Sequence, residues 1–272
     1  MKYRADTVHG HDFGIAMLTK FRNTYLGPIS DRLSDMTSNF HFSNGEVYSM
    51  QEMCGFETLA RGYSPWCNIF TRDDWVNFEY ARDIIHFYRA GPGNPYGPAM
   101  GWLWINATLN LLLQGQAAGP FFFSLYDLIH PSSPLFALGK ADALSVHDGD
   151  IIPMLSALEV FPDRTPLPVT HVLQSRSWRT SSVTPMGGRT VIELLSCSEA
   201  TDSGRNPSKY IRLNINDGAV PLTGCNDGPG GSCALSKFTE RVRERGKDIG
   251  DFRTVCGLGN EMPDRITFLH QD

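Results

Sequence analysis

The chain has 272 residues, of which 41% are hydrophobic and 19% charged, and its formal net charge at pH 7 is −5. This length and composition are typical of a globular protein with a full hydrophobic core, organised as one large or two small domains. The acidic balance argues against a nucleic-acid partner, and no apolar run reaches the roughly 18 residues that a membrane helix needs.

The first 113 residues are expected to form a mainly helical subdomain. Residues 12–35 follow a loose helical pattern, in which Pro28 marks an expected second start. Ser49-Met-Gln-Glu52 has the form of a capping box and predicts the start of another helix. The inner face of that helix would carry Met53, Phe56 and Ala60.

Thr71-Arg-Asp-Asp74 repeats the capping pattern and predicts a further helix, which Gly91 is placed to end. Apolar residues follow at steps of three and four and are expected to face the core: Trp75, Phe78, Ala81, Ile85 and Tyr88. Pro98 can open a mostly buried helix through Leu113. Residues 114–140 are rich in Gly, Pro and Ser, and we expect them to be a connecting loop.

Residues 141–272 are expected to form the C-terminal part of an α/β domain. Residues 189–197 have the pattern of a buried strand, and residues 210–216 alternate apolar and polar side chains. Asp217-Gly218 then predicts a tight hairpin turn, because these residue types accept positive φ angles. The helical first part and the mixed second part together predict a helical subdomain that leads into an α/β sheet.

A last amphipathic helix is predicted near the C-terminus. Ser236 can cap it, and Phe238 and Val242 would face the core. The dense basic run of residues 241–247 has acidic residues interleaved, and we interpret it as a solvated face of this helix.

Residues 141–160 carry the side chains best suited to chemistry. The apolar run before His147 predicts a strand, and helical spacing resumes after Asp150, with Pro153 tolerated in a first helical turn. An imidazole and the carboxyl of Asp148 therefore lie side by side where a strand ends and a helix begins. Unpaired N–H groups and the helix dipole favour an anion at such a place, so the sequence predicts a phosphate site.

A purely structural role for the same residues stays open. Asp148 or Asp150 could simply cap the helix, because Asp is a preferred N-cap residue. His147 would then be a hydrogen-bonded loop residue.

Six cysteines indicate disulfide bonds and an oxidising compartment. Cys54 and Cys67 are close in the sequence, and Cys225 and Cys233 bracket a Gly-rich loop. No CxxC spacing points to zinc or redox chemistry, so each pair is a candidate for a local disulfide. The first residues show no hydrophobic core of a signal peptide, and we expect the chain to be part of something longer.

Six segments carry a recognisable pattern, in one order, between about Gly45 and Cys256. They are Met53-Cys-Gly-Phe-Glu-Thr58, Trp66-Cys-Asn-Ile-Phe-Thr71 with Trp75, Gly93-Asn-Pro-Tyr-Gly-Pro98, His147-Asp148 with Ile151-Ile-Pro153, Asn216-Asp217 with Val220-Pro-Leu222, and Cys225 with Cys233. Together they resemble the histidine acid phosphatases, in particular the fungal phytase-like branch.

The resemblance implies an α/β fold with an incomplete histidine-phosphatase (phosphoglycerate mutase-like) sheet and a helical subdomain. It also implies a two-step phosphomonoester hydrolysis, in which a histidine of an Arg-His-Gly-x-Arg-x-Pro motif attacks phosphorus. His147 resembles the histidine that hydrogen-bonds the phosphoryl group, and Asp148 resembles the general acid that protonates the leaving alkoxide. No metal or other cofactor is expected, since guanidinium and imidazolium groups supply the charge stabilisation.

Two departures from the family pattern bear on the site. Gly149 stands where the family usually has Asn or Thr, and the 272 residues contain no Arg-His-Gly-x-Arg-x-Pro motif. In the family, the cysteines that Cys197 and Cys256 resemble form disulfides with cysteines in the N-terminal part of the enzyme. The 272 residues do not include those partner cysteines, so Cys197 and Cys256 are expected to be unpaired. We therefore interpret the chain as the C-terminal portion of a phytase-like acid phosphatase.

Two functions are compatible with the resemblance. The chain would supply the acid half of a phosphomonoesterase site, with phytate or other phosphomonoesters as substrate and inorganic phosphate as a further ligand, in the secretory pathway or outside the cell. Alternatively, it is an inactive, truncated or degenerate homologue that binds anions weakly or serves as an interaction surface. A Ser-based hydrolase has little support, because no Gly-x-Ser-x-Gly elbow is present. Asn106-Ala-Thr108 is formally a glycosylation sequon inside an expected helix.

Overall fold

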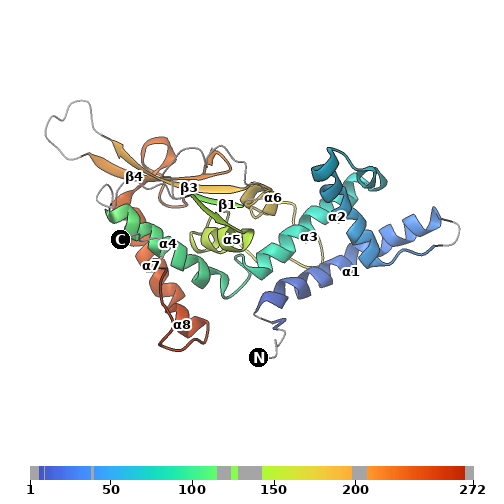
Figure 1. Ribbon diagram of the computed structural model, residues 1–272, viewed down its shortest axis with the longest axis horizontal. Helices are drawn as coiled ribbons and strands as arrows, with labels where there is room; N and C mark the ends of the chain where they lie inside the picture. Colours follow the sequence, from blue (N-terminus) through green and yellow to red (C-terminus); the bar gives the residue numbers. More distant parts are fainter. Residues whose placement is uncertain are drawn as a thin grey trace. The chain divides into compact units, whose positions relative to one another are not determined.

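The computed structural model of the chain describes residues 6–8, 10–37, 40–114, 124–127, 143–197 and 207–266. Its contacts group into two compact units, of which unit 1 has residues 1–89 and 163–179 and unit 2 has residues 90–162 and 180–272. Figure 1 shows the course of the chain and labels its main elements. The expected domain boundaries at residues 113 and 140 are not tested by this grouping and stay a prediction.

Unit 1 is built from helices. It contains α1 (His11–Asp35), α2 (Asn44–Arg61), the 3-10 helix η1 (Pro65–Ile69) and α3 (Arg72–Arg89). α1 packs against α2 and α3. The core between α1 and α3 contains Phe21, Leu26, Tyr80 and Ile84. α1 runs unbroken through Pro28, so the expected second helix start at this proline is wrong.

α2 begins earlier than predicted. The hydroxyl of Ser43 accepts from the N–H of Glu46 at 3.3 Å, and the Glu46 carboxylate accepts from the N–H of Ser43 at 2.8 Å. Ser34 of α1 fixes this entry, because its hydroxyl accepts from the N–H of Phe42 at 3.0 Å. The expected cap at Ser49 therefore lies inside the helix. The expected inner face is exposed (Met53, Phe56 and Ala60), and the buried face is Val47, Tyr48 and Gln51.

The bounds of α3 and the first disulfide agree with the sequence prediction. Of the residues expected to face the core, Ala81 and Tyr88 are buried, whereas Trp75, Phe78 and Ile85 are only half-buried. The N–H of Asp74 donates to the Thr71 hydroxyl at 3.2 Å, and the N–H of Thr71 donates to the Asp74 carboxylate at 2.8 Å. The helix ends at Arg89, close to the predicted stop. Cys54 of α2 is bonded to Cys67 of η1, which confirms this predicted pair.

A buried ion pair ties the second segment of unit 1 to α3. The Nε of Arg176 lies 2.6 Å from a carboxylate oxygen of Asp83, and both side chains are 0% exposed. The same guanidinium lies 3.0 Å from the Glu79 carboxylate and donates to the Leu173 carbonyl at 3.2 Å. Its Cζ also lies 4.9 Å from the ring centroid of Tyr80. Sequence patterns gave no signal for this cluster, because its two halves are more than ninety positions apart.

Unit 2 contains a six-stranded sheet among its described residues, in the order β2-β1-β3-β4-β5, with β6 paired to β4. β1 and β2 are parallel, and the other pairings are antiparallel. The strands are β1 (Ser124–Asp127), β2 (Ala143–Val146), β3 (Arg189–Cys197), β4 (Ser208–Ile215), β5 (Gly218–Ala219) and β6 (Cys233–Ala234). The expected loop 114–140 thus includes a strand, and its other residues from 115 on lie outside the described part.

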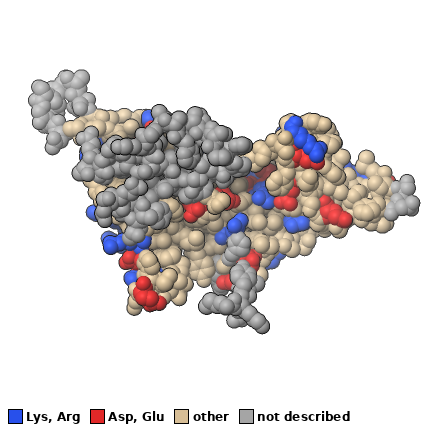
Figure 2. Space-filling model, in the orientation of Figure 1, with Lys and Arg blue, Asp and Glu red and all other residues tan. Residues whose placement is uncertain are grey.

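The remaining elements of unit 2 are α4 (Gly97–Gln114), α5 (Asp148–Ala157), α6 (Thr180–Val183), η4 (Pro229–Gly231), α7 (Leu235–Ile249) and α8 (Phe252–Val255). In Figure 1, α4, α5 and α7 lie on one side of the sheet. In the part of the chain that the structure covers, no helix combines the length and the apolar character needed to cross a membrane. Figure 2 shows basic and acidic side chains interspersed on the visible face.

The two central strands separate an apolar from a polar face. Ile192, Ile211 and Leu213 are buried, whereas the opposite face carries a hydrogen-bonded polar group at Glu193, Arg212 and Asn214. There the Glu193 carboxylate accepts from Arg212 and from Asn214, each at 2.6 Å. The hydrogen bond from the Arg212 guanidinium holds the pKa of Glu193 below its usual value.

α4 and α5 approach each other very closely at a glycine. A Cβ on Gly101 would lie 1.9 Å from the carbonyl oxygen of Pro153, so the position has no room for a larger residue. Pro153 is the sixth residue of α5 and lies in its second turn, not in the first turn as expected. Because proline has no N–H, the carbonyl of Gly149 receives no helical hydrogen bond from it.

The hairpin after β4 is present, with its turn one residue earlier than predicted. Ile215 pairs with Gly218, so the turn residues are Asn216 and Asp217, at φ angles of 50° and 70°. Two positive φ values suit a tightly twisted two-residue turn. Asn216 fixes the register, because its side chain accepts from the N–H of Arg189 at 3.0 Å and donates to a carbonyl of α6 at 2.8 Å.

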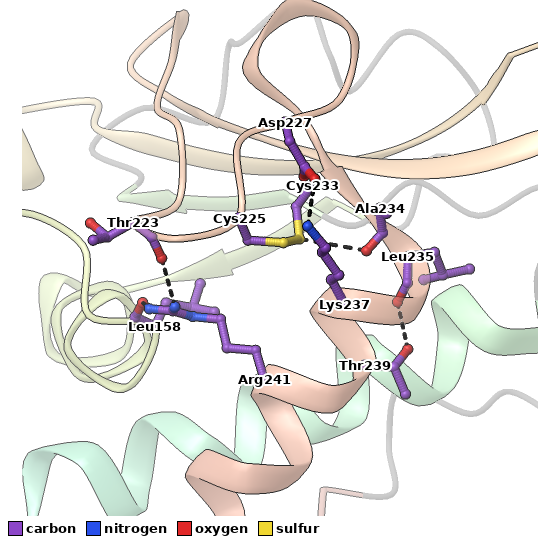
Figure 3. Close-up of a disulfide and its surroundings, with 10 residues drawn as sticks. All are labelled: Leu158, Thr223, Cys225, Asp227, Cys233, Ala234, Leu235, Lys237, Thr239 and Arg241. Carbon is purple, nitrogen blue, oxygen red and sulfur yellow. Dashed lines mark hydrogen bonds and ion pairs between the residues drawn. A yellow bond between two sulfur atoms is a disulfide. The ribbon is translucent and has the colours of Figure 1, made fainter.

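α7 carries the expected buried residues Phe238 and Val242, but its N-cap is Ala234 and not Ser236. Cys225 and Cys233, just before this helix, form the second predicted disulfide (Figure 3). The basic run is not simply a solvated face, because two of its arginines bind the end of α5, as described below.

Candidate functional site

His147 and Asp148 lie at the predicted junction. β2 ends at Val146, His147 is the N-cap residue with extended backbone angles of −93° and 167°, and α5 starts at Asp148. The His147 side chain is exposed and that of Asp148 is half-buried. The strand-to-helix junction at these residues is therefore confirmed, while the chemical roles of His147 and Asp148 stay predictions.

The two acidic residues of the turn make different contacts. The Asp150 carboxylate accepts from the N–H of His147 at 3.4 Å, which is the contact of a capping carboxylate at the third helical position. An oxygen of the Asp148 carboxylate accepts from the N–H of Gly149 at 2.8 Å. Of the two residues considered as caps, Asp150 makes the capping contact with His147, whereas Asp148 binds the N–H of the residue that follows it.

Gly149 leaves space at the site. A Cβ built on this residue meets no atom within 4 Å, and its φ is not positive. The Asn or Thr that the family pattern has at this position would therefore fit without displacing the backbone. The departure at Gly149 removes a side chain from the turn but does not reshape it.

α5 holds the junction rigidly because its body is in the core. Ile151, Ile152, Met154 and Leu155 are buried completely. Fixing a helix through its apolar face positions the polar residues at its first turn, which is what a site for directed hydrogen bonds requires.

The far end of α5 is held by two arginines of α7. Arg241 donates to the carbonyl of Leu158 at 3.1 Å and to that of Thr223 at 2.8 Å (Figure 3). Arg245 donates to the carbonyl of Ala157 at 3.4 Å, and both guanidinium groups lie within 3.4 Å of the Glu159 carboxylate. Cations at a helix C-terminus stabilise its unpaired carbonyls. Sequence reasoning missed this contact, although the spacing of two arginines four residues apart on one helix could have suggested a shared target.

The two remaining cysteines form no disulfide within this chain. Cys197 at the end of β3 and Cys256 after α8 are both free and half-buried. Burial raises the pKa of the Cys256 thiol above its usual value. Within the described residues, no group of three His, Cys, Asp or Glu side chains is arranged to hold a metal ion.

Comparison with known proteins assigns this arrangement to a family. Residues 4–216 match the histidine phosphatase superfamily (branch 2). Phytase PHO112 of Candida albicans is 29% identical over 249 residues, which are 92% of this chain and 48% of the relative. Acid phosphatase PHO1 of Komagataella pastoris is 30% identical over 254 residues, which are 93% of this chain and 49% of the relative.

A solved structure extends the likeness to the fold. The crystal structure of the phytase from D. castellii superposes with a TM-score of 0.77 at 25% identity, over 96% of this chain and 50% of the phytase chain. The chain thus spans about half the length of the relatives it matches. The predicted α/β fold, with a partial sheet and a helical part, is confirmed.

Proposed function

Because the chain belongs to the histidine phosphatase superfamily (branch 2), we propose that it contributes the His147–Asp148 half of a site for phosphomonoester hydrolysis. The observation that carries the proposal is the position of these two residues. They are adjacent at the start of a helix that follows a parallel strand, and the body of that helix is buried. Ligands bind at such strand ends in α/β sheets, and helix starts favour anions.

Asp148 has the role of proton donor in this proposal. An alkoxide is a poor leaving group, so a positioned carboxylic acid that protonates it contributes about 10²- to 10⁴-fold to the rate. The carboxyl must be protonated on arrival, which favours acidic conditions. His147 binds the phosphoryl oxygens, and its exposed side chain beside Asp148 is compatible with this role.

The substrate class we propose is phytate or other phosphomonoesters. The similar proteins named above are a phytase and an acid phosphatase, which supports this class without choosing within it. No metal and no cofactor is part of the proposal, because arginine and histidine side chains can neutralise the phosphoryl charge.

A second candidate function rests on one observation from the sequence. The 272 residues contain no Arg-His-Gly-x-Arg-x-Pro motif, so the proposed nucleophile is not among them. In this alternative, the chain is an inactive homologue that binds anions weakly or acts as an interaction surface. It predicts that the purified 272-residue chain does not turn over p-nitrophenyl phosphate at acidic pH.

The test of the first function begins with the coding sequence around this chain, in which we expect Arg-His-Gly-x-Arg-x-Pro upstream. The complete protein is then assayed with an alkyl phosphate and with p-nitrophenyl phosphate. We expect Asp148→Asn to lower kcat for the alkyl ester by about 10²- to 10⁴-fold. The loss should be much smaller for the p-nitrophenyl ester, because p-nitrophenolate leaves without a proton.

Asp150→Asn is the matched control, since it removes the same charge two residues away. It should lower thermal stability through the lost cap and leave kcat within a few-fold of the wild type. Equal losses on both esters, or a loss in Asp148→Asn no larger than that in Asp150→Asn, would contradict the donor role. A coding sequence without the nucleophile motif would favour the inactive alternative.

We also place the protein in the secretory pathway or outside the cell. Two disulfides support this location, because they persist in oxidising compartments. The sequon at Asn106 lies within α4, and the buried hydroxyl of Thr108 donates to the Trp104 carbonyl at 2.8 Å. A helical sequon whose threonine hydroxyl is buried and hydrogen-bonded is a poor substrate for glycosylation, and we expect Asn106 to remain unmodified.

A further inference from the structure

A second place in unit 2 has the features of a ligand site. An open groove of about 660 Å³ lies between the C-terminal end of α4, the beginning of β4 and one face of α7. Along α7 it is lined by Leu235, Thr239 and Arg243, which are spaced by four residues and so follow one side of the helix over about two turns. None of its lining residues belongs to the segment 147–150. We call it the α7 groove.

Among the described residues that line the α7 groove, every charge is positive. Lys209 of β4 and Arg243 of α7 contribute an ammonium and a guanidinium, and none of these described lining residues is Asp or Glu. This is unusual in a chain with a net charge of −5. Two cations that face one groove without a carboxylate attract an anionic ligand.

These two cations also lack the carboxylate partners that several other basic residues of unit 2 have. Within the described residues, neither Lys209 nor Arg243 makes an ion pair or a side-chain hydrogen bond. In contrast, a carboxylate binds each of Arg189, Arg212, Arg241, Arg245 and Arg253. The guanidinium and ammonium donors in the groove therefore remain available to a ligand.

The rest of the lining combines a hydroxyl donor with apolar surface. Ser236 of α7 adds a hydroxyl group, and Leu113 at the end of α4 is 45% exposed. The N–H and O–H donors of the ammonium, the guanidinium and this hydroxyl suit a compact head with more than two acceptor oxygens, which a phosphate has and a carboxylate does not. Exposed apolar side chains beside them suit a non-polar body.

We propose that the α7 groove binds an organic phosphate with a small apolar or aromatic body, with Lys209 and Arg243 holding the head and Leu113 contacting the body. This inference goes beyond the proposed hydrolysis and does not depend on it. Phenylphosphonate is the probe, since its carbon–phosphorus bond cannot be cleaved by a phosphatase and binding is measured without turnover.

Titration of the 272-residue chain with phenylphosphonate by calorimetry should give saturable binding. Arg243→Gln and Lys209→Gln should each weaken it by about tenfold or more, because each removes a charged hydrogen-bond donor. Lys20→Gln, on a helix of unit 1, makes the same charge change elsewhere and should leave the affinity unchanged. Leu113→Ser should weaken phenylphosphonate more than methylphosphonate, which has almost no apolar body. Thermal unfolding of each variant checks that it is folded.

Each contrary result is decisive. No saturable binding to the wild-type chain, or an affinity of Arg243→Gln and Lys209→Gln equal to that of the wild-type chain, overturns the proposal. Tighter binding of benzoate than of phenylphosphonate overturns the phosphate class. The His147→Ala chain separates the two sites: loss of binding there, with Arg243→Gln unaffected, places the anion at α5 and leaves the α7 groove empty. The reverse result supports the groove even if the proposed hydrolysis fails.

Discussion

The Asp83–Arg176 pair should be the most sensitive polar contact of unit 1. Replacing Asp83 by Asn keeps the shape of the side chain and leaves the buried guanidinium without its 2.6 Å carboxylate. Breaking a buried ion pair costs about 3–5 kcal/mol. We expect the lower end, about 3 kcal/mol, because Glu79 at 3.0 Å and the Leu173 carbonyl at 3.2 Å still accept from Arg176.

Urea unfolding followed by tryptophan fluorescence measures this loss. Hydrogen exchange of residues 163–179 locates it, because this segment is held to α3 by the same contact. Glu79→Gln is the control: its carboxylate is 38% exposed, and removing such a charge should cost at most about 1 kcal/mol.

The double variant Asp83→Leu with Arg176→Met should lose less stability than Asp83→Asn alone, since no uncompensated charge remains buried. A cost below about 1 kcal/mol for Asp83→Asn, or equal costs for Asp83→Asn and Glu79→Gln, would refute this reasoning.

Three further outcomes follow from contacts in unit 2. Gly149→Ala should stabilise the protein by about 0.5–1 kcal/mol, because Gly149 lies in a helix and has space for a methyl group. The stabilisation should appear as a higher melting temperature, and a lower one would contradict this. Arg241→Met should lower the free energy of unfolding in urea by about 1–3 kcal/mol, because charged hydrogen bonds are lost. Arg243 has no such partner among the described residues, so Arg243→Met should change that free energy by about 0.5 kcal/mol or less. The pKa of Glu193 is lowered in the folded state from 4.5, so its contribution is present above pH 4.5 and is lost as the pH falls below that value. Glu193→Gln should therefore be less stable than the wild type near neutral pH, and the difference should shrink on acidification; a difference independent of pH would show that the carboxylate charge contributes nothing.

Local signals in the sequence were sufficient to predict the strand-to-helix junction at which the candidate site lies. The change from strand to helix around His147 is set by residues within ten positions of it, and apolar spacing reports that directly. The two disulfides were predictable for the same reason, because their cysteines are 13 and 8 positions apart. The thiols of Cys197 and Cys256 were predicted to be unpaired only through the family resemblance.

The sequence predictions were wrong at positions where two local patterns are equally good and contacts with residues far away in the sequence decide which one forms. Ser43 and Ser49 both begin a Ser-x-x-Glu sequence, and contacts with α1 select the first. Asn216-Asp217 and Asp217-Gly218 are both good turn pairs, and the side chain of Asn216 selects the former by bonding Arg189. Partners that are far apart along the chain, such as Asp83 and Arg176, leave no periodic trace at all.

The closeness of α4 and α5 at Gly101 makes this glycine a remote part of the candidate site. A methyl group there would overlap a backbone carbonyl of α5, which cannot rotate out of the way as a side chain can. The whole helix would have to slide, and it would carry His147 and Asp148 with it. In a survey of natural variants, a change at residue 101 should therefore have the same kind of effect as a change at His147 or Asp148. This holds even though 46 positions of sequence separate the glycine from His147.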